Sequence, residues 1–204
     1  MEYQLSLEEE LLYSFFTQVY PITKEEFKPI AKVIKKKSYR RGDYILNIGQ
    51  IETKTSFVIK GIVHQYVIIE DNSFTIDISL AGMSFNCFTS FIESTPSNQI
   101  QQAVTDVEII YLEKKDSEKL LLDSKPFCYI YTKLYEQVHL EREKRSLLLQ
   151  YKSAYERYKQ FLATIVKSKQ FLEEVPQKMI ADYLSLTPET FSRVKRKYLT
   201  NTIS

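Results

Sequence analysis

Apolar residues near the C-terminal end of the chain recur at helical spacing in two short segments with a turn between them. In the first segment, Gln177 to Leu184, the apolar residues Ile180, Ala181 and Leu184 fall on one face of a helix. The pair Ser185–Leu186 follows and predicts a tight turn. A helix and a turn are therefore expected before the next apolar pattern begins.

The second segment starts with three residues that suit the N-terminus of a helix. Thr187 can accept hydrogen bonds from the free backbone amides as N-cap, and Pro188 fits the first helical position. The negative charge of Glu189 suits the positive end of the helix dipole. Phe191 and Val194 then face inward, so a second helix is predicted.

The opposite side of this second helix is polar and basic. Its side chains are Glu189, Thr190, Ser192 and Arg193, and Lys195, Arg196 and Lys197 follow. A short helix that is apolar on one side and arginine-rich on the other is typical of a helix-turn-helix that reads the major groove of DNA. The alternative is an ordinary helical cluster with a solvated basic end, because single patterns of this kind are weak signals. We favour DNA recognition because the turn, the cap and the polar face occur in the required order.

The pattern changes to β between Lys35 and Leu112. Residues that favour strands are concentrated in four segments, Ser56–Ile59, Ile62–Glu70, Phe74–Leu80 and Val107–Leu112. Asp71–Asn72 is a good hairpin turn between two of them. All 4 glycines of the chain lie in this region, where tight turns need positive φ. Short strands at regular spacing predict an antiparallel sandwich or roll.

Helical signals flank the β region on both sides. Capping-box spacing at Ser6–Glu9 and Thr23–Glu26 predicts two short N-terminal helices. Helix returns after Asp116, and a long helix is expected from Ser124 to about Tyr151. Its apolar residues recur at three- and four-residue steps and are Phe127, Ile130, Tyr131, Leu134, Val138 and Leu148, with Glu141 and Arg145 as charged interruptions. This stripe can form a dimer seam or pack on its own roll, and the two roles are compatible.

A further capping box, Ser153–Glu156, predicts the helix that supports the helix-turn-helix. The apolar and aromatic residues of this helix are Tyr155, Tyr158, Phe161, Leu162 and Ile165.

Composition fits a packed soluble protein and a phosphate-bearing partner on one side. Hydrophobic residues make up 44% and charged residues 26% of the 204 residues, and 15 Tyr with 12 Phe supply bulk for a core. Residues 142–204 carry 13 Lys and Arg against 6 Asp and Glu, whereas residues 1–141 are net acidic. Such asymmetry favours nucleic-acid binding by the basic part, although two surfaces of different charge would also produce it. No apolar run approaches a membrane span and no signal peptide is evident, so a cytoplasmic location without a membrane partner is expected.

Other chemistry has little support in the sequence. The two cysteines, Cys87 and Cys128, are too few for a disulfide framework and are expected to be reduced and buried. Cys87 could act as a thiol sensor or haem ligand, but a small buried hydrophobic residue is the preferred interpretation. His64 and His139 lie far apart and are not expected to bind a metal. We predict no cofactor, no metal site and no enzymatic activity, because no catalytic motif is present.

Motifs recur along nearly the whole chain. They are Tyr39–Asp43, Ile48–Gln50, Phe57–Gly61 and Gly82 in the roll, then Ser153–Tyr158, Val175–Leu184 and Thr187–Arg193. With these motifs the chain resembles the cyclic-AMP receptor protein / fumarate–nitrate regulator (Crp/Fnr) family of transcription factors, and it is similar in style to the short forms common in the Bacteroidetes. The C-terminal motif is the specific part of the resemblance.

The resemblance implies an α+β architecture in three parts. These are an antiparallel β-roll sensor domain like cyclic-nucleotide-binding domains (1–125, with flanking helices), a long dimerisation helix (126–151) and a helix-turn-helix domain (152–204). Only seven residues follow Lys197, so the wing of the DNA-binding domain is expected to be short or absent.

The resemblance also implies roles in DNA binding. The base-contacting positions are Glu189, Ser192 and Arg193. The positions that match phosphate contacts are Gln177, Lys178, Thr187 and Thr190. Apart from the resemblance, the charges of Lys195, Arg196 and Lys197 are expected to add nonspecific attraction to phosphates. In physical terms, Arg193 can donate a bidentate pair to guanine and Glu189 can accept from cytosine.

The effector pocket departs from the pattern of the cyclic-nucleotide binders. In those proteins a Gly-Glu pair and an Arg-Ser/Thr pair hold the ribose and phosphate, but this chain has Asn86–Cys87 and Ser97–Asn98 there, after Gly82. A buried phosphodiester without an arginine partner would be poorly compensated. The pocket is therefore expected to be degenerate, and the effector is expected to be an unknown small molecule other than cyclic AMP.

The sequence thus predicts a homodimeric transcription regulator that binds an inverted repeat in double-stranded DNA. RNA polymerase is a candidate further partner. The alternative is a small-molecule or redox sensor, or a protein-interaction module, whose helix-turn-helix is only structural.

Overall fold

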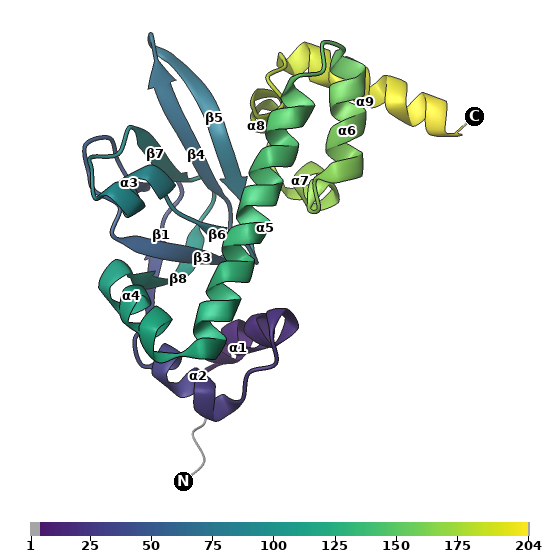
Figure 1. Ribbon diagram of the computed structural model, residues 1–204. Coiled ribbons are helices and arrows are strands. Elements are labelled where there is room, and N and C mark those ends of the chain that lie inside the picture. Colours follow the sequence, from purple (N-terminus) through teal and green to yellow (C-terminus); the bar gives the residue numbers. More distant parts are fainter. Residues whose placement is uncertain (1–4, 204) are drawn as a thin grey trace. The chain divides into compact units, whose positions relative to one another are not determined.

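The computed structural model describes residues 5–203 and contains two compact units (Figure 1). The first unit is taken from Met1–Gln65 and Ser79–Glu136, and the second from Tyr66–Ile78 and Gln137–Ser204. The three-part division expected from the sequence, with boundaries near residues 125 and 151, stays a prediction.

In the described part of the chain, residues 5–203, eight strands form two four-stranded sheets, as predicted for a roll. The first sheet has the order β1 (Lys35–Tyr39), β8 (Val107–Glu113), β3 (Lys54–Lys60) and β6 (Ser84–Phe85). The second has the order β2 (Tyr44–Leu46), β7 (Gln99–Ala103), β4 (Val63–Ile69) and β5 (Asn72–Ser79). The pairings of β8 with β1 and with β3 are antiparallel. With the helices, this architecture confirms the predicted α+β class.

The first sheet buries apolar side chains on both faces. Val58 of β3 and Ile109 of β8 belong to a core that also contains Val63 of β4. Ile110 of β8 points to the other face, where Phe57 of β3 packs against the N-terminal helices. Alternation along each strand produces this separation, because successive side chains point to opposite faces. We call the face that carries Phe57 and Ile110 the outer face.

The hairpin turn between β4 and β5 lies one residue earlier than predicted. Glu70 and Asp71 have φ values of 49° and 61°, so they are the central residues of the turn. Asn72 instead begins β5, and its side-chain amide donates to the carbonyl oxygen of Glu70 at 2.9 Å. Asx side chains satisfy turn carbonyls in this way, so Asn72 stabilises the turn from just outside it.

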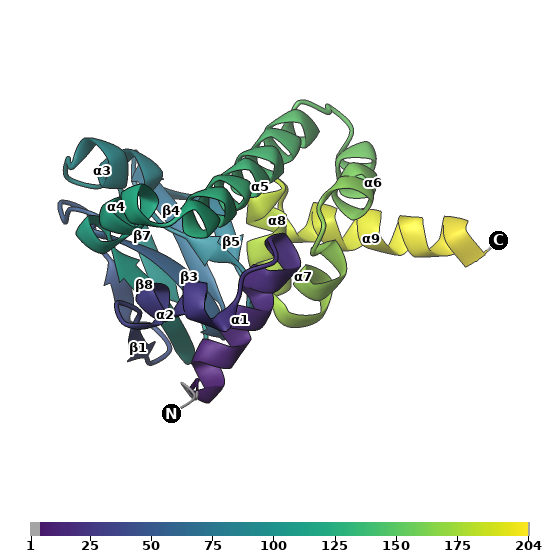
Figure 2. The same ribbon diagram turned by 60° about the horizontal axis from the view of Figure 1, so that its bottom comes forward.

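From residue 5 onward, the first unit contains four helices besides the start of a long one. They are α1 (Leu7–Val19), α2 (Lys24–Ala31), α3 (Phe88–Glu93) and α4 (Lys114–Asp123). Both predicted capping boxes are present, at Ser6 with Glu9 and at Thr23 with Glu26. The pattern of strand-forming residues did not indicate α3, which has only 6 residues. α1 and α2 lie on the side of the first sheet that Figure 2 brings forward.

The predicted long helix is α5 (Lys125–Leu149), and it contributes to both units. Phe127 and Ile130 are buried in the core of the first unit, as expected if the stripe packs on its own roll. Three large apolar residues of the helix remain exposed, namely Tyr129, Leu140 and Leu147. Among residues 5–203, no helix has the length and apolar character needed to span a membrane.

The second unit contains a cluster of short helices around an aromatic core. Its helices are α6 (Ala154–Thr164), α7 (Ser168–Glu174), α8 (Gln177–Tyr183) and α9 (Pro188–Ile203). The predicted support helix is α6, and Ser153 caps it by accepting from the backbone N–H of Glu156 at 3.3 Å. Helix α7 was not predicted. In Figures 1 and 2 the last turns of α9 extend beyond the other helices of this unit.

Candidate nucleic-acid interface and effector region

The predicted helix-turn-helix is formed by α8, a tight turn and α9. Ser185 has a φ of 51°, and its backbone N–H donates to the carbonyl of Asp182 at 2.9 Å. The N–H of Leu186 donates to the carbonyl of Ala181, also at 2.9 Å. Two consecutive bonds of this kind end α8 and reverse the chain, as in the left-handed caps that terminate many helices.

Helix α9 begins as the sequence predicts. The hydroxyl of Thr187 accepts from the backbone N–H of Thr190 at 3.2 Å, and Pro188 is the first helical residue. The pKa of Glu189 is held below its usual range, first by its own backbone N–H and then by the Thr187 hydroxyl. Glu189 is therefore a carboxylate at neutral pH, fixed at the positive end of the helix.

The two sides of α9 differ in burial. Phe191 is fully buried and Val194 is 6% exposed, whereas Glu189, Ser192 and Arg193 are exposed. The structure thus brings the three candidate base-contacting residues together on accessible surface near the start of one helix. A face of this kind can donate and accept hydrogen bonds at base edges.

The candidate phosphate-contacting residues surround this face unevenly. Gln177 and Lys178 are exposed at the start of α8, and Thr187 and Arg196 are also exposed, while Thr190 and Lys195 are half-buried. Lys197 differs, because its ammonium lies 4.9 Å from the ring centroid of Tyr155 in α6. α9 continues to Ile203 as one helix, so residues 198–203 form no wing.

The buried face of α9 packs against aromatic rings of the second unit. The Phe191 and Tyr158 rings meet edge to face at 5.7 Å, and Tyr158 also contacts Tyr198 at 5.7 Å. Phe161 contacts Tyr183 of α8 at 6.2 Å. These pairs fix α8 and α9 on α6.

Two arginines that the sequence analysis did not assign to this site satisfy the carbonyls at the end of α8. Arg157 of α6 donates to the carbonyls of Leu184 and Ser185 at 2.8 and 3.0 Å. Arg145 of α5 donates to the carbonyl of Tyr183 at 3.0 Å, with its guanidinium 4.4 Å from the Tyr183 ring centroid. The only signal in the sequence was the charge of Arg145 within an apolar stripe.

The candidate effector residues are only partly brought together. Cys87 and Ser97 are buried, and the Ser97 hydroxyl lies 3.2 Å from the Cys87 sulfur. The Asn86 amide donates to the Tyr135 hydroxyl at 3.4 Å, whereas Asn98 is exposed. Gly82 has a φ of 80° and makes a backbone bond to Val58 at 2.9 Å, which is a structural role.

A buried glutamate that the sequence analysis missed lies beside Cys87. Glu52 is 2% exposed, and one carboxylate oxygen accepts from Gln101 Nε2 at 2.9 Å and from the Cys87 backbone N–H at 3.4 Å. The other accepts from the Lys54 N–H at 3.2 Å. Burial raises the pKa of Glu52, although these donors oppose the effect. Nothing in the local pattern marks a glutamate before a strand as buried.

The remaining candidate groups are separate. Cys128 is exposed, so the expectation that both cysteines are buried was wrong for this one. The reason is that successive helical residues are about 100° apart, which turns Cys128 away from the face that buries Phe127 and Ile130. Burial lowers the pKa of His64 to about 4, which keeps its imidazole neutral. Within residues 5–203, no group of three or more His, Cys, Asp or Glu side chains could hold a metal ion.

Replacing Arg157 should loosen the helix-turn-helix. We expect Arg157→Met to lower the free energy of unfolding by about 2 kcal/mol, because it leaves the Leu184 and Ser185 carbonyls without their charged donor. Lys159→Met on the same helix is the matched control and should cost less than about 0.5 kcal/mol, since Lys159 makes only an exposed ion pair at 3.9 Å. Urea unfolding of the two variants measures the difference, and equal losses would contradict the role of Arg157.

Glu52 should make stability depend on pH. A carboxyl whose pKa is raised on folding stabilises the fold fully below its unfolded value, near 4.5, and loses this contribution as pH rises through the folded value. Glu52→Gln keeps the size of the side chain without the charge, and the loss of one of the two acceptor oxygens adds a cost that does not depend on pH. Its stability relative to wild type should therefore improve as pH is raised from 4 to 7, in urea unfolding at several pH values. A constant difference across that range would show that Glu52 does not titrate in this way.

Comparison with known proteins supports the resemblance through structure. No protein-family model matches the sequence, and no curated protein matches it either. FixK2 from Bradyrhizobium japonicum has 25% identity and a TM-score of 0.66, covering 84% of this chain and 87% of FixK2.

Two further structures share the fold at lower identity. A putative transcriptional regulator of the Crp/Fnr family from Eubacterium rectale has 16% identity and a TM-score of 0.64, over 92% of this chain and 88% of that one. The cyclic di-GMP-responsive regulator CLP from Xanthomonas campestris has 14% identity and a TM-score of 0.63, over 88% and 93%. The fold of this chain is thus similar to that of solved transcriptional regulators, one of them described as a member of the Crp/Fnr family, in agreement with the resemblance seen in its sequence motifs.

Proposed function

We propose that this chain is a sequence-specific DNA-binding transcription regulator of the Crp/Fnr type. The observation that carries this proposal is the division of α9 into two faces. Glu189, Ser192 and Arg193 are exposed, whereas Phe191 and Val194 are buried. A helix that packs on its own domain through one face and exposes polar side chains on the other can enter the major groove without losing its packing. FixK2 and the Crp/Fnr regulator from Eubacterium rectale support the proposal through their shared fold.

Base recognition is assigned to the start of α9. Arg193 can donate two parallel hydrogen bonds to O6 and N7 of guanine, and Glu189 can accept from N4 of cytosine. Ser192 lies one residue before Arg193 and can donate or accept at a neighbouring base. The depressed pKa of Glu189 suits this role, because only the ionised carboxylate is a pure acceptor.

Phosphate contacts are assigned to residues around Glu189, Ser192 and Arg193. Gln177 and Lys178 at the start of α8, and Thr187 at the start of α9, can bind one strand of the backbone. Thr190, Lys195 and Arg196 extend the set along α9. Lys197 is the weakest member, because its ammonium is already placed over the Tyr155 ring.

The regulator is proposed to act as a homodimer in the cytoplasm. The exposed Tyr129, Leu140 and Leu147 of α5 are the apolar side chains that a partner helix would cover. A twofold arrangement would present two α9 helices to half-sites of an inverted repeat, about one turn of DNA apart. RNA polymerase stays a candidate partner to which no surface is assigned.

The effector is proposed to be a molecule other than cyclic AMP. The Glu52 carboxyl already accepts from the Cys87 N–H at the start of α3. A phosphate at this position would meet a second acidic group in a buried site, with Ser97 in place of the arginine that would neutralise it.

Arg193→Ala tests base recognition. We expect specific binding to weaken by about 1–3 kcal/mol and one base position of the selected site to become relaxed. Lys178→Ala is the control for phosphate binding and should weaken all sequences alike with a flatter salt dependence. Selection from random DNA followed by gel shifts distinguishes the two effects. Absence of any enriched inverted repeat with wild-type protein would instead favour a sensor or interaction module whose helix-turn-helix is only structural.

Titration with cyclic AMP tests the effector region. We expect no saturable heat signal in calorimetry at micromolar protein and ligand, because the site offers a carboxyl group in place of a cationic partner. Wild-type protein from the same preparation must bind its selected operator, which shows that it is folded. A clear isotherm would contradict the roles given to Glu52 and Ser97.

A further inference from the structure

Arg145 of α5 joins two parts of the second unit that are far apart in sequence. Its guanidinium group donates to the carbonyl oxygens of Thr75 and Ile76 in β5 at 2.8 and 2.9 Å. The same group donates to the carbonyl oxygen of Tyr183, at the end of α8, at 3.0 Å from Nη2 and 3.2 Å from Nε. One side chain therefore connects the hairpin of β4 and β5 to the helix-turn-helix.

The two connected segments belong to the same compact unit. The part of the hairpin from Tyr66 to Ile78 groups with α8 and α9 and not with the rest of the roll. In addition, β5 is the outermost strand of the second sheet, so its outer edge is open to other parts of the chain. The contacts of the hairpin thus make it a component of the unit that contains the candidate recognition helix.

Tyr183 carries the contact further into the helix-turn-helix. The Arg145 guanidinium lies 4.4 Å from the centroid of the Tyr183 ring, and Tyr183 is 4% exposed. The same ring meets those of Phe171 in α7 and Phe161 in α6 at 5.4 and 6.2 Å. Because a close-packed core transmits displacements, a shift of Arg145 acts on the rings that support α9.

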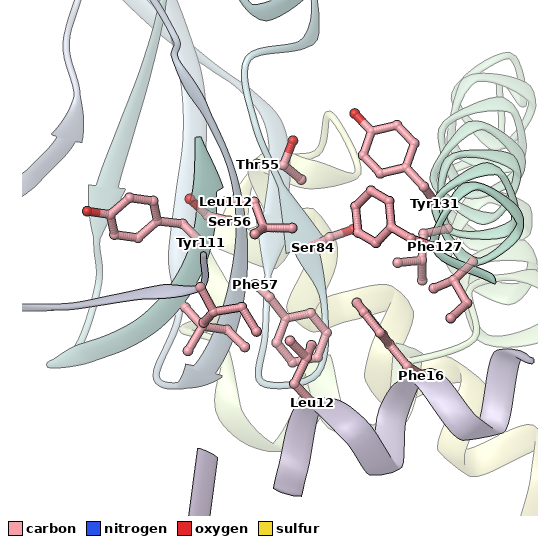
Figure 3. A pocket seen from close by; sticks show the side chains of 14 residues that line it. Leu12, Phe16, Thr55, Ser56, Phe57, Ser84, Tyr111, Leu112, Phe127 and Tyr131 are labelled. Atoms are coloured by element: carbon pink, nitrogen blue, oxygen red, sulfur yellow. The ribbon is translucent and has the colours of Figure 1, made fainter. Parts of the chain in front are cut away.

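The first turns of α5 are held in a different way. Phe127 and Tyr131 project toward Phe57 of the first sheet and Phe16 of α1, around a small apolar hollow (Figure 3). None of the side chains that line this hollow is charged. Apolar contacts are not directional, whereas the planar guanidinium group fixes the direction of each carbonyl that it binds. Arg145 therefore defines the orientation of the segments around the second half of α5.

We propose that Arg145 is a positioning residue for DNA recognition and makes the β4–β5 hairpin a functional part of the helix-turn-helix unit. This inference rests on the proposed function. Arg145 acts without touching DNA, because it ties the end of α8 to β5 and so sets the orientation in which α9 meets the major groove. DNA bound at α9 in turn stabilises the hairpin, since coupling between two sites is reciprocal.

Arg145→Met tests the effect on DNA binding. It should weaken binding to the operator selected with wild-type protein about tenfold, because the end of α8 loses a charged donor and its tie to β5. The salt dependence should not change, since Arg145 neutralises no phosphate. An Arg145→Met variant with a flatter salt dependence would overturn the proposal.

Arg142→Met is the matched control for this measurement. Arg142 precedes Arg145 by three residues on α5, and its buried Nε has no hydrogen bond to any residue that the structure describes. The control should bind the operator within about twofold of wild type. Equal losses in the two variants would show that Arg145 has no special role in positioning.

Hydrogen exchange of the full chain tests the connection itself. Without DNA, Arg145→Met should speed exchange about tenfold both in β5 and at the Ser185 and Leu186 amides of the turn. Arg157→Met, which loses bonds to the turn but none to β5, should speed exchange in the turn alone. Adding the operator should slow exchange in β5 of wild type and Arg142→Met, but not of Arg145→Met.

The outcomes separate this inference from the proposed function. Unchanged exchange of β5 in Arg145→Met, or equal protection of β5 by the operator with and without Arg145, would overturn the connection. If Arg145→Met does not fold, as judged by circular dichroism, Arg145→Lys replaces it, because lysine retains the charge but not the planar set of donors. If wild-type protein selects no operator, the proposed function fails, and the exchange of the free protein still decides whether Arg145 joins the two segments.

Discussion

The display of the candidate recognition helix depends on two arginines that satisfy the end of the preceding helix. The turn supplies N–H donors for the carbonyls of Ala181 and Asp182, whereas the carbonyls of Tyr183, Leu184 and Ser185 need other partners. Arg157 and Arg145 donate to them from α6 and α5. Their positive charge also suits the negative end of the helix dipole. With α8 ended in this way and Phe191 buried beneath, the polar side of α9 is left accessible.

The helix-turn-helix could be predicted because its determinants are local. The cap at Thr187, the proline after it and the spacing of Phe191 and Val194 all act within a few residues, and all appear in the structure. The role of Arg157 could not be predicted in this way, because its partners lie 27 and 28 positions away. The turn at Glu70–Asp71 was misplaced by one residue because Asn72 carries an equally strong turn signal but acts from outside the turn.

In the candidate effector region, too, local sequence patterns did not reveal contacts between residues that are distant in sequence. The motif comparison identified Cys87 and Ser97, which the fold does bring together. It could not identify Glu52, because a glutamate is buried only when distant donors such as Gln101 and the Cys87 amide surround it. The position of Ser84 beside Phe57 depends likewise on the register between β6 and β3. Pairing between strands that are far apart in sequence is decided by tertiary structure.

The continuity of α5 has a mechanical consequence. After Pro126 the helix contains no proline or glycine up to Leu149, so no residue within it relieves a twist. Tyr131 and Leu140 lie on this same helix, about two and a half turns apart. The same helix contributes residues to both compact units, so a change in the conformation of its first turns acts on an element that the two units share. No proline or glycine between these turns and Leu149 offers a hinge at which the helix would bend instead.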